Sequence, residues 1–209
     1  MTGLQAGFNK RKLAKVQYYA VRDLKKVICT TQRAGSTSMI EAMAPAGLNS
    51  QSELIDAAMA LNLRKGGWPV LLWLRDPMTR FASAYAIFGA GRIPISREIA
   101  TLKHRTPVLF ADTVFALDDA HWAPTTRLHT YMGVFLPTKI YPFYDLAETW
   151  AEEMPGYRLA LLNRTKRKSW NELAGELNAN YINMLTKHYE EDLKMLDWCN
   201  EYGSMENAA

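Results

Sequence analysis

The sequence predicts an α/β fold, a single domain with a central, mainly parallel sheet flanked by helices. Apolar, β-rich segments alternate along the chain with segments of helical periodicity, as in strands joined by crossover helices. The segment 68–74 (WPVLLWL) is apolar at every position, as expected of a parallel strand covered on both faces. A chain of 209 residues with 48% hydrophobic residues is large enough to bury one substantial core.

The N-terminal 26 residues carry an excess of positive charge. They hold seven basic side chains and one acid, whereas the rest of the chain holds 18 basic and 20 acidic residues. Leu13, Val16 and Ala20 have helical spacing, which predicts a short amphipathic helix within 10–21. We therefore divide the chain into a basic helical arm at 1–25 and a domain at 26–209. A basic arm of this kind is compatible with binding to nucleic acid or to an anionic membrane. A solvated basic helix is the interpretation that we favour.

The first half of the domain contains a strand and two helices before segment 68–74. A strand is predicted at 26–31 (KVICTT) and a helix at 37–43 (TSMIEAM). A second helix is predicted over 50–67, because Ser50 and Glu53 have capping-box spacing. The helix that follows segment 68–74 has a clear start, with Asp76 as the N-cap and Pro77 at the first helical position.

The second half begins with an irregular stretch and ends in helices. No regular pattern is visible over 89–137. A strand and a helix are predicted within 138–154, and another strand over 157–163. Ser169 and Glu172 have capping-box spacing at the start of a long helical region. Its apolar face is formed by Leu173, Leu177, Tyr181, Leu185, Tyr189, Leu193 and Leu196.

The loop at 31–38 (TQRAGSTS) has the composition of an anion site. It joins a strand to a helix, and a helix N-terminus presents free N–H groups and a positive dipole end. Gly35 permits close backbone approach and Arg33 supplies a permanent charge. The loop has no Gly-Lys-Ser/Thr sequence, so it is not a Walker A motif. Three hydroxyl donors follow the glycine, from Ser36, Thr37 and Ser38.

A second anion site is predicted after segment 68–74. Arg75 lies at the carboxyl end of that strand, where open α/β sheets bind ligands. Arg80 and Ser83 follow on the same face of the next helix. Two anion sites at one sheet edge suit a nucleotide with phosphate groups at both ends.

These segments resemble the sulfotransferases that use 3′-phosphoadenosine 5′-phosphosulfate (PAPS), in particular their carbohydrate branch. TTQRAGSTSM (30–39) resembles the 5′-phosphosulfate loop, whose usual form is Pro-Lys-x-Gly-(Ser/Thr)-(Ser/Thr). RDPMTRFASAY (75–85) matches the 3′-phosphate motif Arg-Asp-Pro-x-x-Arg-x-x-Ser-x-Tyr at every defined position. AHWAP (120–124), DLAETW (145–150) and YEEDLKML (189–196) resemble further segments of that branch.

The resemblance implies a P-loop-like sulfotransferase fold, PAPS as donor and 3′-phosphoadenosine 5′-phosphate as product. It implies a hydroxyl, or an amine, of a glycan or small molecule as acceptor. Arg75 and Ser83 would hold the 3′-phosphate. The family's loop lysine is replaced by Arg33, which keeps the charge but has a planar geometry. The 5′-phosphosulfate would be held by Arg33, Ala34, Gly35, Ser36, Thr37 and Ser38.

The general base is left open by the sequence. Related enzymes place a histidine or glutamate between the two motifs, and here that interval has no histidine. Its acids include Glu53 and Asp56, which capping and the helix dipole explain equally well. His121 is the other candidate, although a histidine beside a tryptophan is often structural. Trp122 would either stack on adenine or a sugar ring or belong to the core.

Composition predicts a cytoplasmic protein that acts without a metal. Cys29 and Cys199 make no disulfide framework, and neither a signal sequence nor an apolar span is visible. No His, Cys or carboxylate cluster has metal-ligand spacing. The basic residues at 164–168 either close over the 3′-phosphate or form a solvated loop. We expect an acceptor substrate as partner and no nucleic acid, and the oligomeric state is undetermined.

Two other functions compete with the sulfotransferase hypothesis. One is a P-loop nucleotide kinase or NTPase, in which the strand ending at Asp76 would serve as a Walker B strand. The other is a non-catalytic nucleic-acid-binding protein that uses the basic arm and would show steep salt dependence. The first lacks its phosphate-binding lysine, and the second leaves the motif at 75–85 unexplained.

Overall fold

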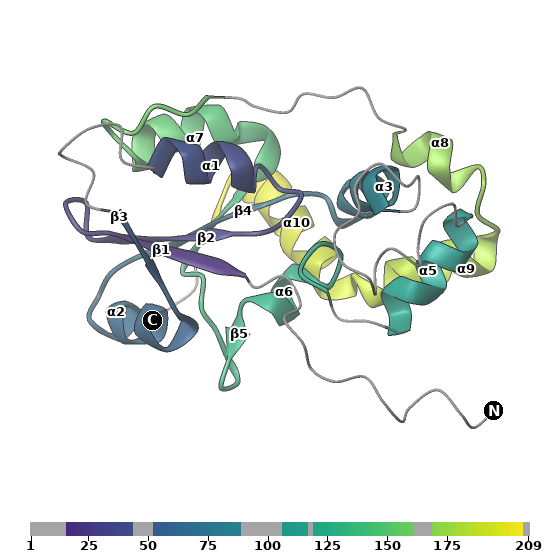
Figure 1. Cartoon of the computed structure of the whole chain (residues 1–209), viewed down its shortest axis with the longest axis horizontal. Coiled ribbons are helices and arrows are strands. Elements are labelled where there is room, and N and C mark those ends of the chain that lie inside the picture. The colour runs from purple at the N-terminus through teal and green to yellow at the C-terminus, as the bar shows by residue number, and fades with distance from the viewer. Residues whose placement is uncertain (1–15, 44–51, 89–105, 117–118, 161–168, 207–209) are drawn as a thin grey trace.

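A six-stranded sheet between two layers of helices forms the centre of the fold (Figure 1). The computed structural model describes residues 16–43, 52–88, 106–116, 119–160 and 169–206. The strands lie across the sheet in the order β3-β1-β2-β4-β7-β8. Their bounds are β1 Gln17–Val21, β2 Lys26–Thr30, β3 Ser52–Ile55, β4 Val70–Leu74, β7 Lys139–Pro142 and β8 Met205–Glu206. A separate two-stranded ribbon consists of β5 Thr130–Tyr131 and β6 Val134–Phe135.

The sheet is parallel at its centre and antiparallel at its edges. β2 pairs with β4 and β4 with β7 in parallel, whereas β1 pairs antiparallel with both β2 and β3, and β7 with β8. The predicted α/β class with flanking helices is confirmed. Since β2, β4 and β7 run in the same direction, their C-terminal ends lie side by side, and the segments that follow them meet there. We call this the carboxyl edge.

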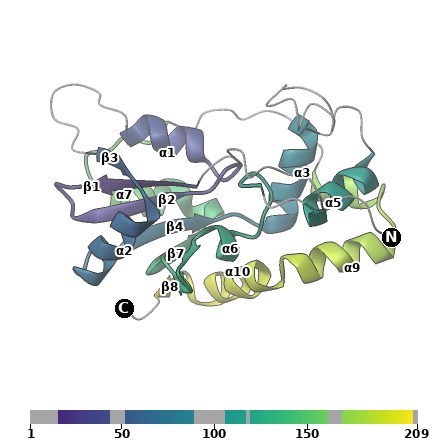
Figure 2. The same cartoon turned by 60° about the horizontal axis from the view of Figure 1, so that its bottom comes forward.

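Helices cover both faces of the sheet and extend beyond the carboxyl edge. Figure 1 shows α1 and α7 over one face and α2 on the other, and Figure 2 shows α9 and α10 one after the other, from the helical extension to the sheet. The helical bounds are α1 Ser36–Met43, α2 Ala57–Lys65, α3 Pro77–Phe88, α5 Pro107–Ala116, α6 Thr125–Leu128, the 3₁₀ turn η1 Phe143–Asp145, α7 Leu146–Glu153, α8 Trp170–Ala174, α9 Ala179–His188 and α10 Glu190–Tyr202.

The two faces of the sheet carry separate apolar cores. Every residue of β4 is buried, and alternate residues belong to different clusters. Leu71 and Trp73 pack with α1 and α7, while Leu72 and Leu74 pack with α2 and α10. Burial on both faces explains why the strand is apolar without alternation.

A third core lies in the helical extension. It joins α3 and α5 to α8 and α9 around the completely buried ring of Trp122. The predicted apolar face of the C-terminal region contributes Leu173, Leu177, Leu185 and Tyr189 to this core, whereas Leu196 packs under the sheet. That face therefore continues across three helices. Breaks after Ala174 and at Tyr189 divide the region that the sequence predicted as one long helical stretch.

Several predicted elements are confirmed. The loop at 31–38, which we call the anion loop, is preceded by the strand β2 and leads into the helix α1. α3 begins at Pro77 as predicted, because the Asp76 Oδ1 atom accepts the Thr79 N–H at 2.6 Å. The capping box of Ser169 and Glu172 is present at the start of α8. The strand and helix predicted within 138–154 are β7 and α7.

Three predicted elements are wrong within the described residues. The helix at 10–21 is wrong for 17–21, which form β1: Val16 and Ala20 have helical spacing, but Tyr18 and Ala20 are buried alternately, as in a strand. The helix at 50–67 is β3 followed by the shorter α2, and Asp56 caps it by accepting the Met59 N–H at 2.8 Å. Residues 157–160 are not a strand, and 161–163 lie outside the described residues.

Candidate functional site

The two segments predicted to bind anions, 31–38 and 75–85, meet at the carboxyl edge. Arg75 directly follows β4, and its Nη1 donates to the Arg33 carbonyl oxygen at 2.7 Å. The Arg33 Nε in turn donates to Ser83 Oγ on α3 at 3.4 Å. Both arginine side chains are half-buried. The structure thus brings together three of the residues predicted to bind the donor, although they are far apart in the sequence.

The loop between β2 and α1 folds tightly over the end of its strand. The Ala34 N–H donates to the Thr31 carbonyl oxygen at 3.1 Å. Arg33 has φ of 67° and Gly35 has φ of 73°, so both adopt the left-handed conformation. A non-glycine residue in this region is strained, and such strain is concentrated at ligand sites. The first N–H groups of α1, which have no partners within their helix, begin directly after this turn.

A glycine is required at position 35 by close packing as well as by its φ. A Cβ atom there would lie 2.7 Å from Cε2 of Phe143 and 3.2 Å from Cδ2 of Leu146. Phe143 directly follows β7, and its ring centroid lies 5.7 Å from Cζ of Arg75. The ends of β2, β4 and β7 are therefore in contact through the loop, Arg75 and Phe143. Sequence reasoning did not identify Phe143, because its partners are distant in the chain.

The hydroxyl groups of the loop differ in exposure. Ser36 and Ser38 are buried, whereas Thr37 is exposed. The Ser36 Oγ donates to Oε1 of Gln32 at 3.5 Å, which joins the helix start to the residue before Arg33. Ala34 is also buried. Ser36 and Ser38 are thus held within the fold of the loop, and Thr37 faces outward.

Arg80, the second arginine of the 75–85 motif, is buried and holds a neighbouring loop. One of its nitrogens, Nη2, donates to the carbonyl oxygens of Trp122 and Ala123. Within the described residues, its Nε and Nη1 have no hydrogen-bond partner. Tyr189 Oη donates to the same Trp122 carbonyl at 2.6 Å. Since Trp122 is completely buried, we assign its ring to the core rather than to nucleotide stacking.

His121 lies in this loop beside a buried carboxylate. Its Nδ1 donates to Asp119 Oδ1 at 2.5 Å, and its backbone N–H donates to the same oxygen at 2.9 Å. Its side chain is 11% exposed. Within the described residues, no hydrogen bond joins His121 to the anion loop. Its ring packs edge-on against Phe88, with 4.8 Å between the ring centroids.

Glu53 lies away from the anion loop. It is an exposed residue of β3 and forms a 2.5 Å ion pair with Arg22. In the sheet it lies opposite Ala20, which lies opposite Val27. Val27 precedes the loop by four residues, roughly 13 Å along an extended strand. The structure therefore does not bring Glu53 together with the residues predicted to bind the donor, and Asp56 serves as the cap of α2.

A buried histidine that sequence reasoning missed supports the start of the loop. Nε2 of His129 lies 2.9 Å from Thr31 Oγ1, and its Nδ1 lies 3.3 Å from the Tyr18 hydroxyl oxygen. Burial lowers the pKa of His129 from its ordinary value of 6.5 to about 3, with a further contribution from the positive charge of Arg80. The ring is thus neutral at physiological pH. No local motif marks His129, since its partners, in β1 and directly after β2, are distant in the sequence.

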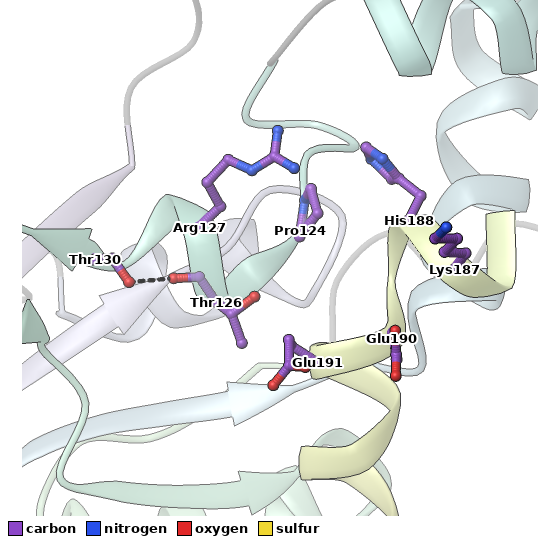
Figure 3. Close-up of a pocket in the computed structure, with 8 residues that line it drawn as sticks. All are labelled: Pro124, Thr126, Arg127, Thr130, Lys187, His188, Glu190 and Glu191. Carbon is purple, nitrogen blue, oxygen red and sulfur yellow. Dashed lines mark hydrogen bonds between the residues drawn. The ribbon is translucent and has the colours of Figure 1, made fainter. Parts of the chain in front are cut away.

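A surface pocket of about 390 Å³ lies next to this region (Figure 3). It lies between α6 and the junction of α9 with α10, and Thr130 Oγ1 donates to the Thr126 carbonyl oxygen at 2.7 Å on its wall. The pocket contains none of the anion-loop residues. The lining carries both signs of charge, from Arg127 and Lys187 on one side and Glu190 and Glu191 on the other. Its other residues are Pro124, Thr126, Thr130 and His188.

The described part of the chain bears on the two competing functions. The Asp76 carboxylate is used to cap α3, rather than standing free at a strand end. Two cations of the N-terminal segment form ion pairs, Arg22 with Glu53 and Lys26 with Glu153. The other basic residues at 1–15, and those at 164–168, lie outside the described residues.

Within the described residues, no group of three or more His, Cys, Asp or Glu side chains has the arrangement of a metal site. None of the helices in the described ranges has the length and hydropathy needed to span a bilayer. No protein-family model, curated protein or solved structure matches the chain. A functional assignment therefore depends on the residues and contacts described above.

Proposed function

We propose that this protein is a sulfotransferase that transfers the sulfuryl group of PAPS to a hydroxyl, or an amine, of a glycan or small-molecule acceptor. The observation that supports the proposal most strongly is the contact of Arg33 with both Arg75 and Ser83. These residues belong to the two segments that resemble the donor-binding motifs of that family. A resemblance confined to separate segments would arise more easily by chance than one whose matching residues also touch.

The proposed donor site uses each end of the nucleotide differently. Arg75 and Ser83 hold the 3′-phosphate by a charged and a neutral hydrogen bond. The 5′-phosphosulfate lies at the start of α1, where unpaired N–H groups and the helix dipole favour an anion. Arg33 stands between the two groups, since its side chain reaches Ser83 and its carbonyl contacts Arg75.

The proposed reaction is an in-line displacement at sulfur without a metal. The acceptor oxygen attacks the sulfur while the bond from sulfur to the 5′-phosphate oxygen breaks. Negative charge grows on that phosphate oxygen, so fixed donors beside it lower the barrier. Arg33 supplies charge in place of the lysine usual in the family, and backbone N–H groups of residues 35–38 supply further donors.

The first test of the proposal is the affinity of variants for 3′-phosphoadenosine 5′-phosphate, measured by titration calorimetry. Arg75→Ala removes a charged donor, and we expect it to weaken binding by about 100-fold, or ~3 kcal/mol. Ser83→Ala removes a neutral hydrogen bond and is expected to weaken binding by about 5- to 10-fold. Arg22→Ala is the matched control, because Arg22 is an exposed arginine paired with Glu53. Unchanged affinity in both site variants would disprove the assignment.

A further inference from the structure

The loop at 119–124 is held at both ends by hydrogen bonds to buried aspartate residues. Asp119 begins a tight turn, because its carbonyl oxygen accepts the N–H groups of Trp122 at 3.0 Å and Ala123 at 2.7 Å. At the other end, the buried Asp192 of α10 accepts the N–H groups of Thr125 at 2.6 Å and Thr126 at 2.9 Å. These buried hydrogen bonds hold the loop and the start of α6 in one position relative to α10.

The same loop is attached to the helix that carries Ser83. Arg80 lies one turn before Ser83 on α3, and its guanidinium binds the carbonyl groups directly after His121. Tyr189 supports the same Trp122 carbonyl from the other side. The segments 75–85, 120–124 and 189–196 therefore form one hydrogen-bonded unit. His121 is the histidine of this unit, and histidine is the side chain that enzymes use most often for general acid–base catalysis.

The contacts of His121 define which of its nitrogens carries the proton. A carboxylate only accepts hydrogen bonds, so the 2.5 Å contact with Asp119 requires a proton on Nδ1. The other ring nitrogen, Nε2, then has a free lone pair when the ring is neutral. Among the residues that the structure describes, Nε2 has no hydrogen-bond partner. Asp119 is itself almost completely buried and thus holds the ring in one orientation.

We propose that Asp119 is a positioning residue that orients His121 as the general base of sulfuryl transfer, and that Arg80 fixes their loop to the donor-binding helix. This inference rests on the proposed sulfotransferase function. The acceptor O–H proton passes to Nε2 of His121 as the acceptor oxygen forms its bond to sulfur. The electron pair of the broken sulfur–oxygen bond leaves with the 5′-phosphate of the product nucleotide. The Asp119 carboxylate stabilises the imidazolium that results.

The first experiment measures the tautomer of His121 by nitrogen NMR on the full chain with 3′-phosphoadenosine 5′-phosphate bound. We expect a protonated Nδ1 and an unprotonated Nε2 in the wild-type protein. In Asp119→Ala the proton should redistribute toward Nε2, because its acceptor is gone. Asp112→Asn is the control, since this exposed carboxylate accepts the Tyr181 hydroxyl at 2.9 Å on another surface. A proton on Nε2 in the wild type would overturn the inference.

The second experiment measures release of 3′-phosphoadenosine 5′-phosphate from PAPS in the presence of glucosamine, which offers both hydroxyl and amine groups. Loss of a general base or of its orienting carboxylate typically lowers turnover by 10²–10⁴-fold. We therefore expect His121→Gln and Asp119→Asn to lower kcat at least about 100-fold while KM for PAPS stays unchanged. Imidazole in the buffer should partly restore His121→Ala, which a structural role would not predict.

Failure of this inference is distinguishable from failure of the proposed function. If the wild-type chain does not bind 3′-phosphoadenosine 5′-phosphate, the function itself is wrong. If it binds the nucleotide and Asp119→Asn keeps full turnover, or loses nucleotide affinity in step with turnover, only the positioning role is wrong. Arg80→Met keeps much of the buried volume and should lower kcat more than it weakens nucleotide binding.

Discussion

The two ends of the parallel strands use positive charge in different ways. At the amino end, Lys26 of β2 and Lys139 of β7 form ion pairs with Glu153 of α7 at 2.6 Å and 3.3 Å. Burial alone would raise the pKa of Glu153, but hydrogen bonds from Lys26 and Tyr141, together with both lysine charges, lower it. The two lysines at this end are thus paired with a carboxylate, and the ion pairs connect α7 to two strands.

At the carboxyl end, the arginines contact neutral groups. Arg75 donates to a carbonyl oxygen and Arg33 to a hydroxyl oxygen. Arg80 contacts carbonyl oxygens, and within the described residues it pairs with no carboxylate. Burial is the main cause of the low pKa of His129, and the positive charge of Arg80 lowers that pKa further. Lys26 and Lys139 pair with a carboxylate, whereas the contacts described above for Arg33, Arg75 and Arg80 are with neutral oxygen atoms. An anion as a further partner of Arg33 and Arg75 is part of our proposal.

The largest effect on stability is expected at Gly35. Gly35→Ala combines strain at φ of 73° with a Cβ atom 2.7 Å from Phe143, so the free energy of unfolding should fall by ~2–4 kcal/mol. Gly156→Ala is the matched control, since Gly156 has φ of 88° but no atom within 4 Å of its added Cβ. It should lose only the backbone contribution of ~1–2 kcal/mol. Equal losses in urea unfolding would show that the contact with Phe143 is unimportant.

Glu153→Gln separates the amino end from the carboxyl end. It leaves two partly buried lysines without their carboxylate, so we expect a loss of ~1–3 kcal/mol in the free energy of unfolding. Affinity for 3′-phosphoadenosine 5′-phosphate should not change, because the substitution lies at the other end of the strands. A large fall in affinity with little loss of stability would contradict the division into two ends.

The buried His129 predicts acid sensitivity of the carboxyl end. Its pKa is about 3 in the folded state and 6.5 ordinarily, so between these values the unfolded chain binds a proton that the folded chain does not. Stability is therefore complete above pH 6.5 and falls as the pH decreases, by at most ~1.4 kcal/mol per pH unit for this group. In His129→Gln the pH dependence of urea unfolding should be shallower by up to one proton. An identical slope would show that His129 is not the group responsible.

The smallest effect is expected for Glu53→Gln. An exposed ion pair such as Arg22–Glu53 contributes little, so stability should change by less than ~1 kcal/mol. Turnover of PAPS should also be retained, since Glu53 lies far from the loop. A 100-fold loss of turnover with normal nucleotide binding would instead restore Glu53 as the base.

The sequence signals that mark the proposed donor-binding residues are local. Arg75 follows an apolar run, Asp76 and Pro77 mark a helix start, and Gly35 follows a strand. Sequence reasoning failed where two patterns fit one segment. The spacing of Ser50 and Glu53 suggested a capping box, but residues 52–55 pair with β1 instead.

The remaining features depend on contacts between distant segments. Asp119 is two residues from His121, yet the role that we propose for it depends on burial that the sequence does not display. Phe143 and His129 reach the anion loop only because β7 and α6 lie beside it in the fold. Such residues are identified by packing, which periodicity and local motifs do not encode.

Nucleotide specificity of the wild-type chain tests the central claim most directly. Calorimetric titration in EDTA would compare 3′-phosphoadenosine 5′-phosphate with adenosine 5′-phosphate, and ATP with magnesium would be titrated separately. If the carboxyl end is a PAPS site, the first nucleotide binds without metal and loss of its 3′-phosphate weakens binding by at least about 100-fold. Absence of binding, equal affinity for both adenosine nucleotides, or binding of ATP with magnesium alone would contradict the sulfotransferase assignment.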